Sequence, residues 1–482
     1  MKVTDSTLLT STFTPQRIII LFLCIFFEFI IGIATNIAPP LLLIGLVSAP
    51  FIMIYLSTKP ELTYALFVIS VVVFGSAVAG GGAQLGLSKL PKEQLTGRAL
   101  LTPREFISPI LFLVLIIEVF GRRKLISFRG SPADASIAAL LLWAFATLFF
   151  SANIRIGITT YIKILYGIVL FYMTINLLKD RSFVDKAIRY WILASLIAAS
   201  FILIQFFLEN VLNTDIFTRL TGWESERAKG LGKGPNVIAA ILVAITPLTL
   251  ASFLSASSKR AKLFYSFTIF VNVFAILSTL SRLGIFGLVL SFSYFAFRIK
   301  EIRKFLFKMT LIMFISVLLI GSGTILSEIW KRYSKVQQGT EAISASRTAT
   351  YIEAIRVIKE NPIVGIGLGS YSEYMEFTQK GVLEIGPHSL YLYTWMELGI
   401  PGIIIVLWIF SSFAHAAVKA RRNIGTDPYR YYVIAATAGI LPYLVESMFQ
   451  NWKISTPHVW AQLGLVTSIY HIVLKKSNEE YN

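Results

Sequence analysis

The stretch "KLFYSFTIFVNVFAILSTLSRLGIFGLVLSFSYFAFR", residues 262–298, decides the fold class. Between its end residues it holds one charged side chain, that of Arg282. A helix needs about 20 mostly apolar residues to cross the hydrocarbon core of a bilayer. The stretch therefore predicts two membrane spans, 262–281 and 283–299, which meet at Arg282.

The rest of the chain repeats this pattern. Of its 482 residues, 55% are hydrophobic and 15% are charged, whereas soluble domains carry about 25% charged residues. The further candidate spans are 18–34, 37–56, 62–79, 105–120, 134–151, 156–178, 188–208, 235–256, 305–326, 396–418, 431–449 and 457–474. We expect an all-α polytopic membrane protein with about 12–14 transmembrane helices, and one integral membrane domain over residues 1–482. The polar N-terminus and the apolar run after it have no clear cleavage site, so we expect a retained first span.

Loop charges predict the orientation of the spans. Strongly basic segments lie at 121–130, 179–186, 257–262, 298–304 and 419–422, and Lys475 and Lys476 follow the last span. With the spans as predicted, all of these fall on one side of the membrane, which the positive-inside rule makes cytoplasmic. Both termini are then cytoplasmic, and part of the net charge of +18 reflects topology rather than ligand binding.

The longest outer loop, 327–395, contains a predicted helix at 346–360. Ser346 is a suitable N-cap, and Asn361-Pro362 stops the pattern. Apolar residues recur at helical spacing at Tyr351, Ile355 and Ile358. The glycine-rich "GIGLG", residues 365–369, predicts a flexible turn after the helix.

Three residues on the predicted outer face are candidates for chemistry. Arg282 lies at a span junction, Arg347 lies at the start of the loop helix, and His388 lies where the loop re-enters the membrane. Helix N-termini and arginine forks bind phosphate, and a neutral histidine can take a proton from a hydroxyl. Together they would suit an anionic, lipid-linked substrate.

Each of these residues also has a structural interpretation. Arg282 could be an interfacial arginine that extends to lipid headgroups. Arg347 could be a solvated loop charge, and His388 could be a buried structural histidine. Glu397 lies nine residues after His388, about 13 Å along a helix, so we expect it to be structural or paired with a basic residue.

Other kinds of site are poorly supported. There is no Asp-x-Asp, no Cys or His pair has zinc spacing, and the single cysteine, Cys24, excludes an intramolecular disulfide. We therefore expect no metal and no cofactor. "GLGKGPN" at 230–236 lacks the Walker ending and is expected to bend the chain into the span at Pro235, while Lys229 and Lys233 could help to hold an anion. The basic runs are short and each abuts a span, which argues against nucleic-acid binding.

Three stretches together resemble the O-antigen ligase and polysaccharide polymerase family of bacterial membrane glycosyltransferases. They are "TLSRLGIFGLVL", "SRTATYIEAIRVIKENPIVGIGLGSY" and "GPHSLYLYTWMELGIPG". The last is similar to the ligase pattern of His, a small polar residue, nine residues and Gly-x-x-Gly. Ile403 stands where ligases often have a small polar residue, so ligase and polymerase both stay open.

The resemblance implies a fold of the type-C glycosyltransferase kind in the bacterial inner membrane, with the active site on the outer face. The donor would be a glycan on undecaprenyl diphosphate, and the acceptor a glycolipid, such as lipid A core, or a growing polysaccharide. Arg282 and Arg347 would bind the diphosphate, and His388 would activate the acceptor hydroxyl. Transfer would invert the anomeric centre without a metal.

Two alternatives from other classes remain. A transporter or flippase of a lipid-linked or anionic solute predicts charges in the middle of spans and similarity between the two halves of the chain. The chain has few such charges, chiefly Glu28, Lys163 and Glu446, and no half-to-half similarity. A non-catalytic scaffold would tolerate replacement of Arg282, Arg347 and His388.

Overall fold

The computed structural model describes residues 55–56, 58–74, 110–114, 129–217, 227–231, 234–300, 303–304, 308, 350–371, 387–425, 427–450 and 453–480. By its contacts the chain forms two compact units. The first comprises Met1–Phe67 and Arg104–Ser127, and the second comprises Val68–Pro103 and Phe128–Asn482. The expectation of a single membrane domain stays a prediction.

The described regular elements are all helical. In chain order they are α4 (Pro60–Ile69), η1 (Ser70–Phe74), α7 (Asp134–Thr147), η4 (Leu148–Phe150), α8 (Ile154–Leu177), α9 (Arg181–Phe206), η5 (Phe207–Val211), α11 (Pro235–Ser255), α12 (Lys259–Ser278), α13 (Arg282–Arg298), α17 (Leu390–Asn423), α18 (Arg430–Glu446) and α19 (Pro457–Glu480). From α7 onward each long helix matches a predicted span. The predicted span 18–34, nearly all of 37–56 and 305–326, and most of 105–120 lie outside the described residues.

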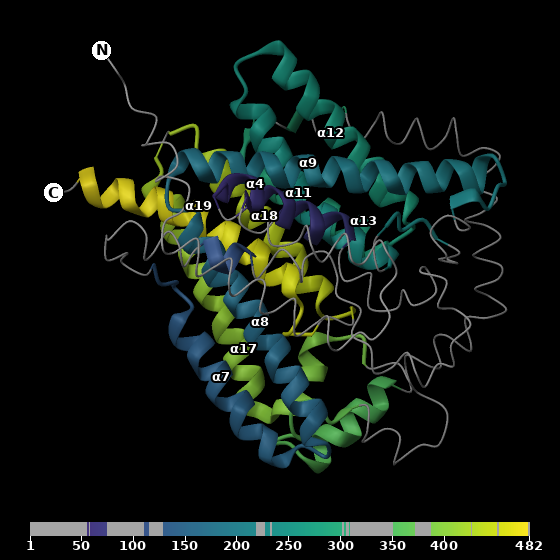
Figure 1. Cartoon of the computed structure of the whole chain (residues 1–482), viewed down its shortest axis with the longest axis vertical. Helices are drawn as coiled ribbons and strands as arrows, with labels where there is room; N and C mark the ends of the chain where they lie inside the picture. Colours follow the sequence, from purple (N-terminus) through teal and green to yellow (C-terminus); the bar gives the residue numbers. More distant parts are fainter. Residues whose placement is uncertain are drawn as a thin grey trace, which may run out of the picture. The chain divides into compact units, whose positions relative to one another are not determined.

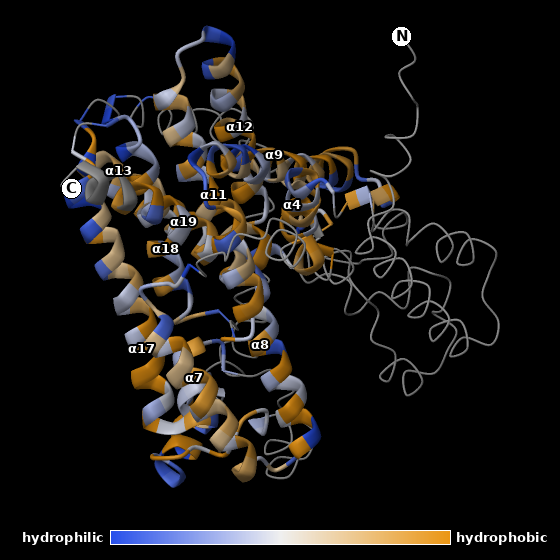
Figure 2. Ribbon diagram, turned by 60° about the vertical axis from the view of Figure 1, so that its left-hand side comes forward, coloured by the Kyte–Doolittle hydropathy of each residue, from blue (hydrophilic) through white to orange (hydrophobic). Residues whose placement is uncertain are grey.

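Five of these segments are long and apolar enough to cross a membrane, namely α8, α9 with η5, α11, α12 and α17. Hydrophobic residues prevail along the helices, and polar residues lie mostly at helix ends and in connections (Figure 2). The protein is thus an all-α polytopic membrane protein, as the sequence predicts. The total of 12–14 spans stays a prediction.

Within the second unit, α11 is the central helix, because most of its apolar segment is buried by neighbouring helices. It packs against α9, α12, α13 and α18, while α8 packs beside α19 and α17 beside α7 (Figure 1). Glycines allow two of these close approaches. A Cβ at Gly439 of α18 would lie 2.4 Å from the carbonyl oxygen of Ala244 of α11, and one at Gly464 of α19 would lie 2.7 Å from Cβ of Thr174 of α8. Small residues serve membrane helix packing in this way.

Helix α17 is broken at Gly399, which has φ 66° and ψ −164°. The rings of Tyr391 and Phe410 lie 6.5 Å apart, although an unbroken helix would separate them by about 28 Å. The chain therefore doubles back at Gly399, from a short helix, 390–398, into a long helix, 400–423. The predicted span 396–418 begins too early, because hydropathy does not register a reversal of the backbone between two apolar helices.

Candidate functional site

His388 lies immediately before the short helix 390–398. The hydroxyl of Ser389 caps this helix by accepting the N–H of Leu392 at 3.4 Å. The N–H of Leu390 donates to the carbonyl of Ser447 at 2.8 Å, just beyond the end of α18. The carbonyl of the half-buried His388 accepts the hydroxyl of Tyr351 at 3.5 Å. We call residues 387–390 with Ser447 the His388 corner.

The loop helix is present, and residues 350–360 of the predicted 346–360 are described as helical. It packs on the short helix through Ala354, Val357 and Ile358, against Tyr393 and Met396. Its buried face is offset from the predicted one, since Ile355 is 46% exposed. Which face of the loop helix is buried depends on where the short helix 390–398 lies, and the spacing of apolar residues in the sequence does not reveal that position. Arg347 and Ser346 lie outside the described residues.

The glycine-rich turn at 365–369 is packed against α17, which differs from the flexible turn expected from the sequence. Its N–H groups at Ile366 and Gly367 donate to the carbonyls of Met396 and Glu397, at 2.8 and 3.1 Å. The break at Gly399 leaves these carbonyls without helical partners, and the turn satisfies them. A Cβ at Gly365 would lie 2.5 Å from the carbonyl oxygen of Met396, so the close approach requires glycine.

Glu397 is buried inside this arrangement, and its carboxylate accepts the N–H of Tyr371 at 3.4 Å. The N–H of Gly369 and the hydroxyl of Tyr393 also bond to it, and Lys453 acts on it electrostatically. Burial and the nearby charge of Glu353 raise the pKa of Tyr371 to about 12, so its hydroxyl stays neutral at physiological pH. The expected structural role of Glu397 beside a basic residue agrees with this geometry.

Arg282 is the first residue of α13 and is exposed. The preceding Ser281 caps the helix, since its hydroxyl accepts the N–H of Gly284 at 3.2 Å. Arg227, a residue that the sequence did not single out, ties this turn to α11. Its guanidinium donates to the carbonyl of Thr279 at 2.8 Å and to Asn236 at 3.0 Å. We call residues 279–284 with Arg227 the Arg282 corner.

Lys229 lies in the segment that leads into α11. The N–H groups of Lys229 and Gly230 both donate to the side-chain oxygen of Gln205, each at 2.9 Å. Burial lowers the pKa of Lys229, and the charge of Glu209 opposes this shift. Helix α11 begins at Pro235, as expected for the bend after "GLGKGPN". Lys233 lies outside the described residues.

The two corners are connected through the end of α18. A Cβ at Gly287 of α13 would lie 2.4 Å from a carboxylate oxygen of Glu446, and the next residue, Ser447, binds Leu390. Glu446 is 1% exposed, and among the described residues neither of its oxygens has a hydrogen-bond partner. The structure thus brings the predicted residues Arg282 and His388 to one end of the same helix group.

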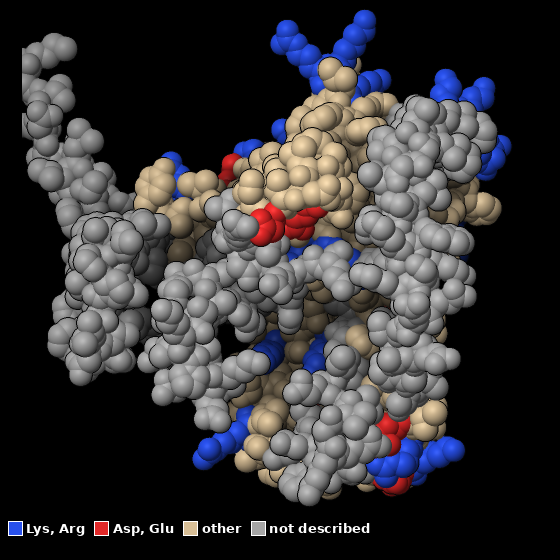
Figure 3. Space-filling view, turned by 90° about the vertical axis from the view of Figure 1, so that its right-hand side faces the viewer, with Lys and Arg blue, Asp and Glu red and all other residues tan. Residues whose placement is uncertain are grey.

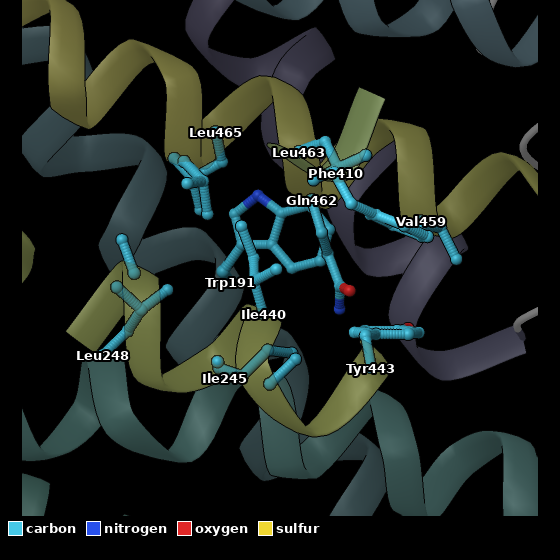
Figure 4. Close-up of a pocket in the computed structure, with 14 residues that line it drawn as sticks. Trp191, Ile245, Leu248, Phe410, Ile440, Tyr443, Val459, Gln462, Leu463 and Leu465 are labelled. Atoms are coloured by element: carbon cyan, nitrogen blue, oxygen red, sulfur yellow. The ribbon is translucent and has the colours of Figure 1, made fainter. Parts of the chain in front are cut away.

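Two small cavities lie behind the His388 corner. One of about 40 Å³ is lined by Leu390, Ser447 and Lys453, among others. The other, of about 30 Å³, has Trp191, Tyr443 and Gln462 in its wall (Figure 4). Such volumes hold a few water molecules and not a glycan. Among the described residues no three His, Cys, Asp or Glu side chains gather into a metal site, and the expected absence of a metal stays a prediction.

Comparison with known proteins bears on both corners. Residues 267–407, which include Arg282 and His388, match the family model described as O-Antigen ligase. This part of the chain matches the O-antigen ligase family. The resemblance inferred from the sequence is thereby confirmed.

A curated O-antigen ligase from Salmonella typhimurium is also similar to the chain. It is 27% identical over 146 residues, which cover 28% of this chain and 31% of the relative. The chain thus matches less than a third of the relative's length. The activity of the relative is therefore a proposal for this chain.

Proposed function

We propose that the protein is a membrane glycan transferase. It moves a glycan from undecaprenyl diphosphate to an acceptor, either lipid A core, as an O-antigen ligase does, or a growing polysaccharide, as a polymerase does. The observation that carries the proposal is that Arg282 and His388, which both lie in the matched segment 267–407, converge at the end of α18. We place the active site on the outer face of the bacterial inner membrane, with both termini in the cytoplasm.

Arg282 is suited to the diphosphate of the donor. It is exposed at the N-terminus of α13, where free N–H groups and the helix dipole favour an anion. Its planar guanidinium can bind two phosphate oxygens at once. Arg347 takes the same role from the loop helix, with Lys229 and Lys233 as further anion contacts. On the face shown in Figure 3, lysine and arginine side chains lie at the upper and lower ends of the described part and also between them.

His388 supplies the base. Its neutral imidazole accepts the proton of the acceptor hydroxyl, and the oxygen attacks the anomeric carbon on the face opposite the diphosphate. The new glycosidic bond forms as the bond to the diphosphate oxygen breaks, which inverts the anomeric centre. The leaving group departs as an anion held by the arginines, so the reaction needs no metal.

The test is glycan transfer by the purified protein in EDTA. The donor is a polyprenyl-diphosphate oligosaccharide, and the acceptors are a lipid A core glycolipid and an oligosaccharide. His388→Ala should reduce the rate by at least about 100-fold, since general base catalysis contributes that much. His415→Ala, at an exposed position of α17, serves as the matched control and should leave the rate unchanged. Gel shift and mass spectrometry read out the product.

The product distinguishes the two forms of the proposal. A ladder of lengthening chains indicates a polymerase, and a single addition to lipid A core indicates a ligase. Transfer that survives His388→Ala would remove the base assignment. Movement of the lipid-linked glycan across liposomes without any transfer would instead support a transporter.

A further inference from the structure

We propose that Lys453 is a positioning residue for His388, an inference that rests on the proposed function. Lys453 lies in the connection between α18 and α19. Its ammonium donates to the hydroxyl of Tyr393 at 2.5 Å and lies 4.2 Å from the centre of the same ring. The side chain therefore reaches from the α18–α19 connection to the short helix that follows His388.

Tyr393 transmits this contact toward His388 and Glu397. Its N–H donates to the carbonyl of Ser389, the residue after His388, at 3.0 Å. Its hydroxyl bonds to the carboxylate of Glu397. Lys453, Tyr393 and Glu397 thus form one connected group, in which both α17 side chains are buried. A buried carboxylate requires a compensating charge and hydrogen bonds, and this group provides them.

The short helix depends on contacts from outside itself. Helix 390–398 is shorter than the roughly 12–15 residues that an isolated helix needs in water, and it ends at the break of Gly399. Tyr351 and Tyr391 help to hold its beginning, through the carbonyls of His388 and Leu444, and two further contacts come from Ser447 and Lys453. One is the bond from Leu390 to Ser447, and the other is the bond from Lys453 to Tyr393.

A cavity beside these contacts gives the start of the helix room to shift. The space of about 40 Å³ is lined by Leu390, Ser447 and Lys453. Losing the Lys453 contact would let His388 move relative to the acceptor, and a misplacement of about 1 Å can cost a reaction about 100-fold. Because the ammonium is engaged with an aromatic ring and lies close to a carboxylate, we assign it to placing His388 rather than to binding the diphosphate.

The kinetic test compares Lys453→Met with Lys453→Arg. Lys453→Met should lower kcat by about 10- to 100-fold and change the donor KM by less than about threefold, because only the placement of the base is altered. Lys453→Arg keeps a cation that can lie over the tyrosine ring and should recover most of kcat. Lys163→Met, at an exposed lysine of α8, is the control. An unchanged kcat, or a raised donor KM with normal kcat, would refute the assignment.

A second readout does not depend on transfer. Leu390→Cys and Ser447→Cys are introduced together after Cys24→Ser, and the rate of disulfide formation reports how closely these positions stay docked. We expect Lys453→Met to slow bond formation at least threefold at an unchanged melting temperature, and Lys453→Arg to restore it. An unchanged rate would overturn the positioning role. If the wild type transferred no glycan to any acceptor, the proposed function would fail. The rate of disulfide formation alone would then decide the role of Lys453.

Discussion

The His388 corner and the Arg282 corner share one local design. In each, a serine caps the helix that carries or follows the candidate residue, Ser281 for α13 and Ser389 for the short helix of α17. The glycine-rich turn 365–369 lies beside the short helix, and Gly234 precedes α11, whose Asn236 bonds to Arg227 of the Arg282 corner. Serine capping follows from the free N–H groups at a helix start, and it leaves the first side chains free to meet a ligand.

The corners differ in how deeply they are built into the fold. The short helix that follows His388 is tied at both ends, by Ser447 and Lys453 near its beginning and by the turn at 361–371 at its end. At the Arg282 corner the arginine is exposed, and Arg227 ties only the turn behind it. We therefore predict that changes around His388 affect folding and catalysis together, whereas changes at Arg282 affect substrate binding alone.

Gly399→Ala should have the largest effect. Its Cβ would lie 1.9 Å from the carbonyl oxygen of Ile363, and the backbone has φ 66°. We expect a loss of about 2–4 kcal/mol in stability and no measurable transfer, because the reversal that places the short helix cannot form. Thermal melting of the purified protein and the transfer assay would measure both.

Gly425→Ala is the control for backbone strain alone. Gly425 has φ 56°, but nothing lies within 4 Å of the Cβ position. We expect only the strain of a left-handed residue, about 1–2 kcal/mol, with transfer retained. Equal losses from the two variants would show that the close approach at Gly399 is unimportant.

Arg282→Ala should have an intermediate effect, confined to substrate binding. A charge-assisted hydrogen bond contributes about 1.5–3 kcal/mol, which corresponds to a donor KM raised about 10- to 150-fold. The melting temperature should not move, because the side chain is exposed. Arg282→Lys keeps the charge but lacks the planar guanidinium. Its donor KM should lie between those of the wild type and Arg282→Ala. A large drop in melting temperature would mean that the Arg282 corner contributes as much to the stability of the fold as the His388 corner does.

Gly234→Ala should have the smallest effect. Gly234 precedes α11 in an extended conformation, with φ −170°, and nothing lies within 4 Å of a Cβ there. The expected change in stability is within about 0.5 kcal/mol, and transfer should continue. A shift in melting temperature as large as that of Gly399→Ala would erase the contrast between the tightly packed Gly399 and the open position of Gly234.

Much of the fold was predictable because apolar runs and helix caps are local signals. Pro235 and Ser281 precede or begin helices as expected. Ile355 shows the limit of prediction from these local signals. Its apolar character predicted burial, but it lies on a face that the loop helix does not bury. Arg227, Lys453 and Glu446 carried no sequence signal for a role in the site, because their importance comes from partners that are distant in the chain.

The sequence by itself determined the membrane class, the approximate positions of the helices and the family motifs around Arg282 and His388, since each depends on residues within one or two helical turns. Only the tertiary structure decided that α17 doubles back at Gly399, that the turn at 365–369 is packed, and that Lys453 reaches Tyr393. These features depend on backbone carbonyls and charges that must find partners once they are buried. Hydropathy records that a residue can be buried, and the folded chain selects which neighbour it is buried against.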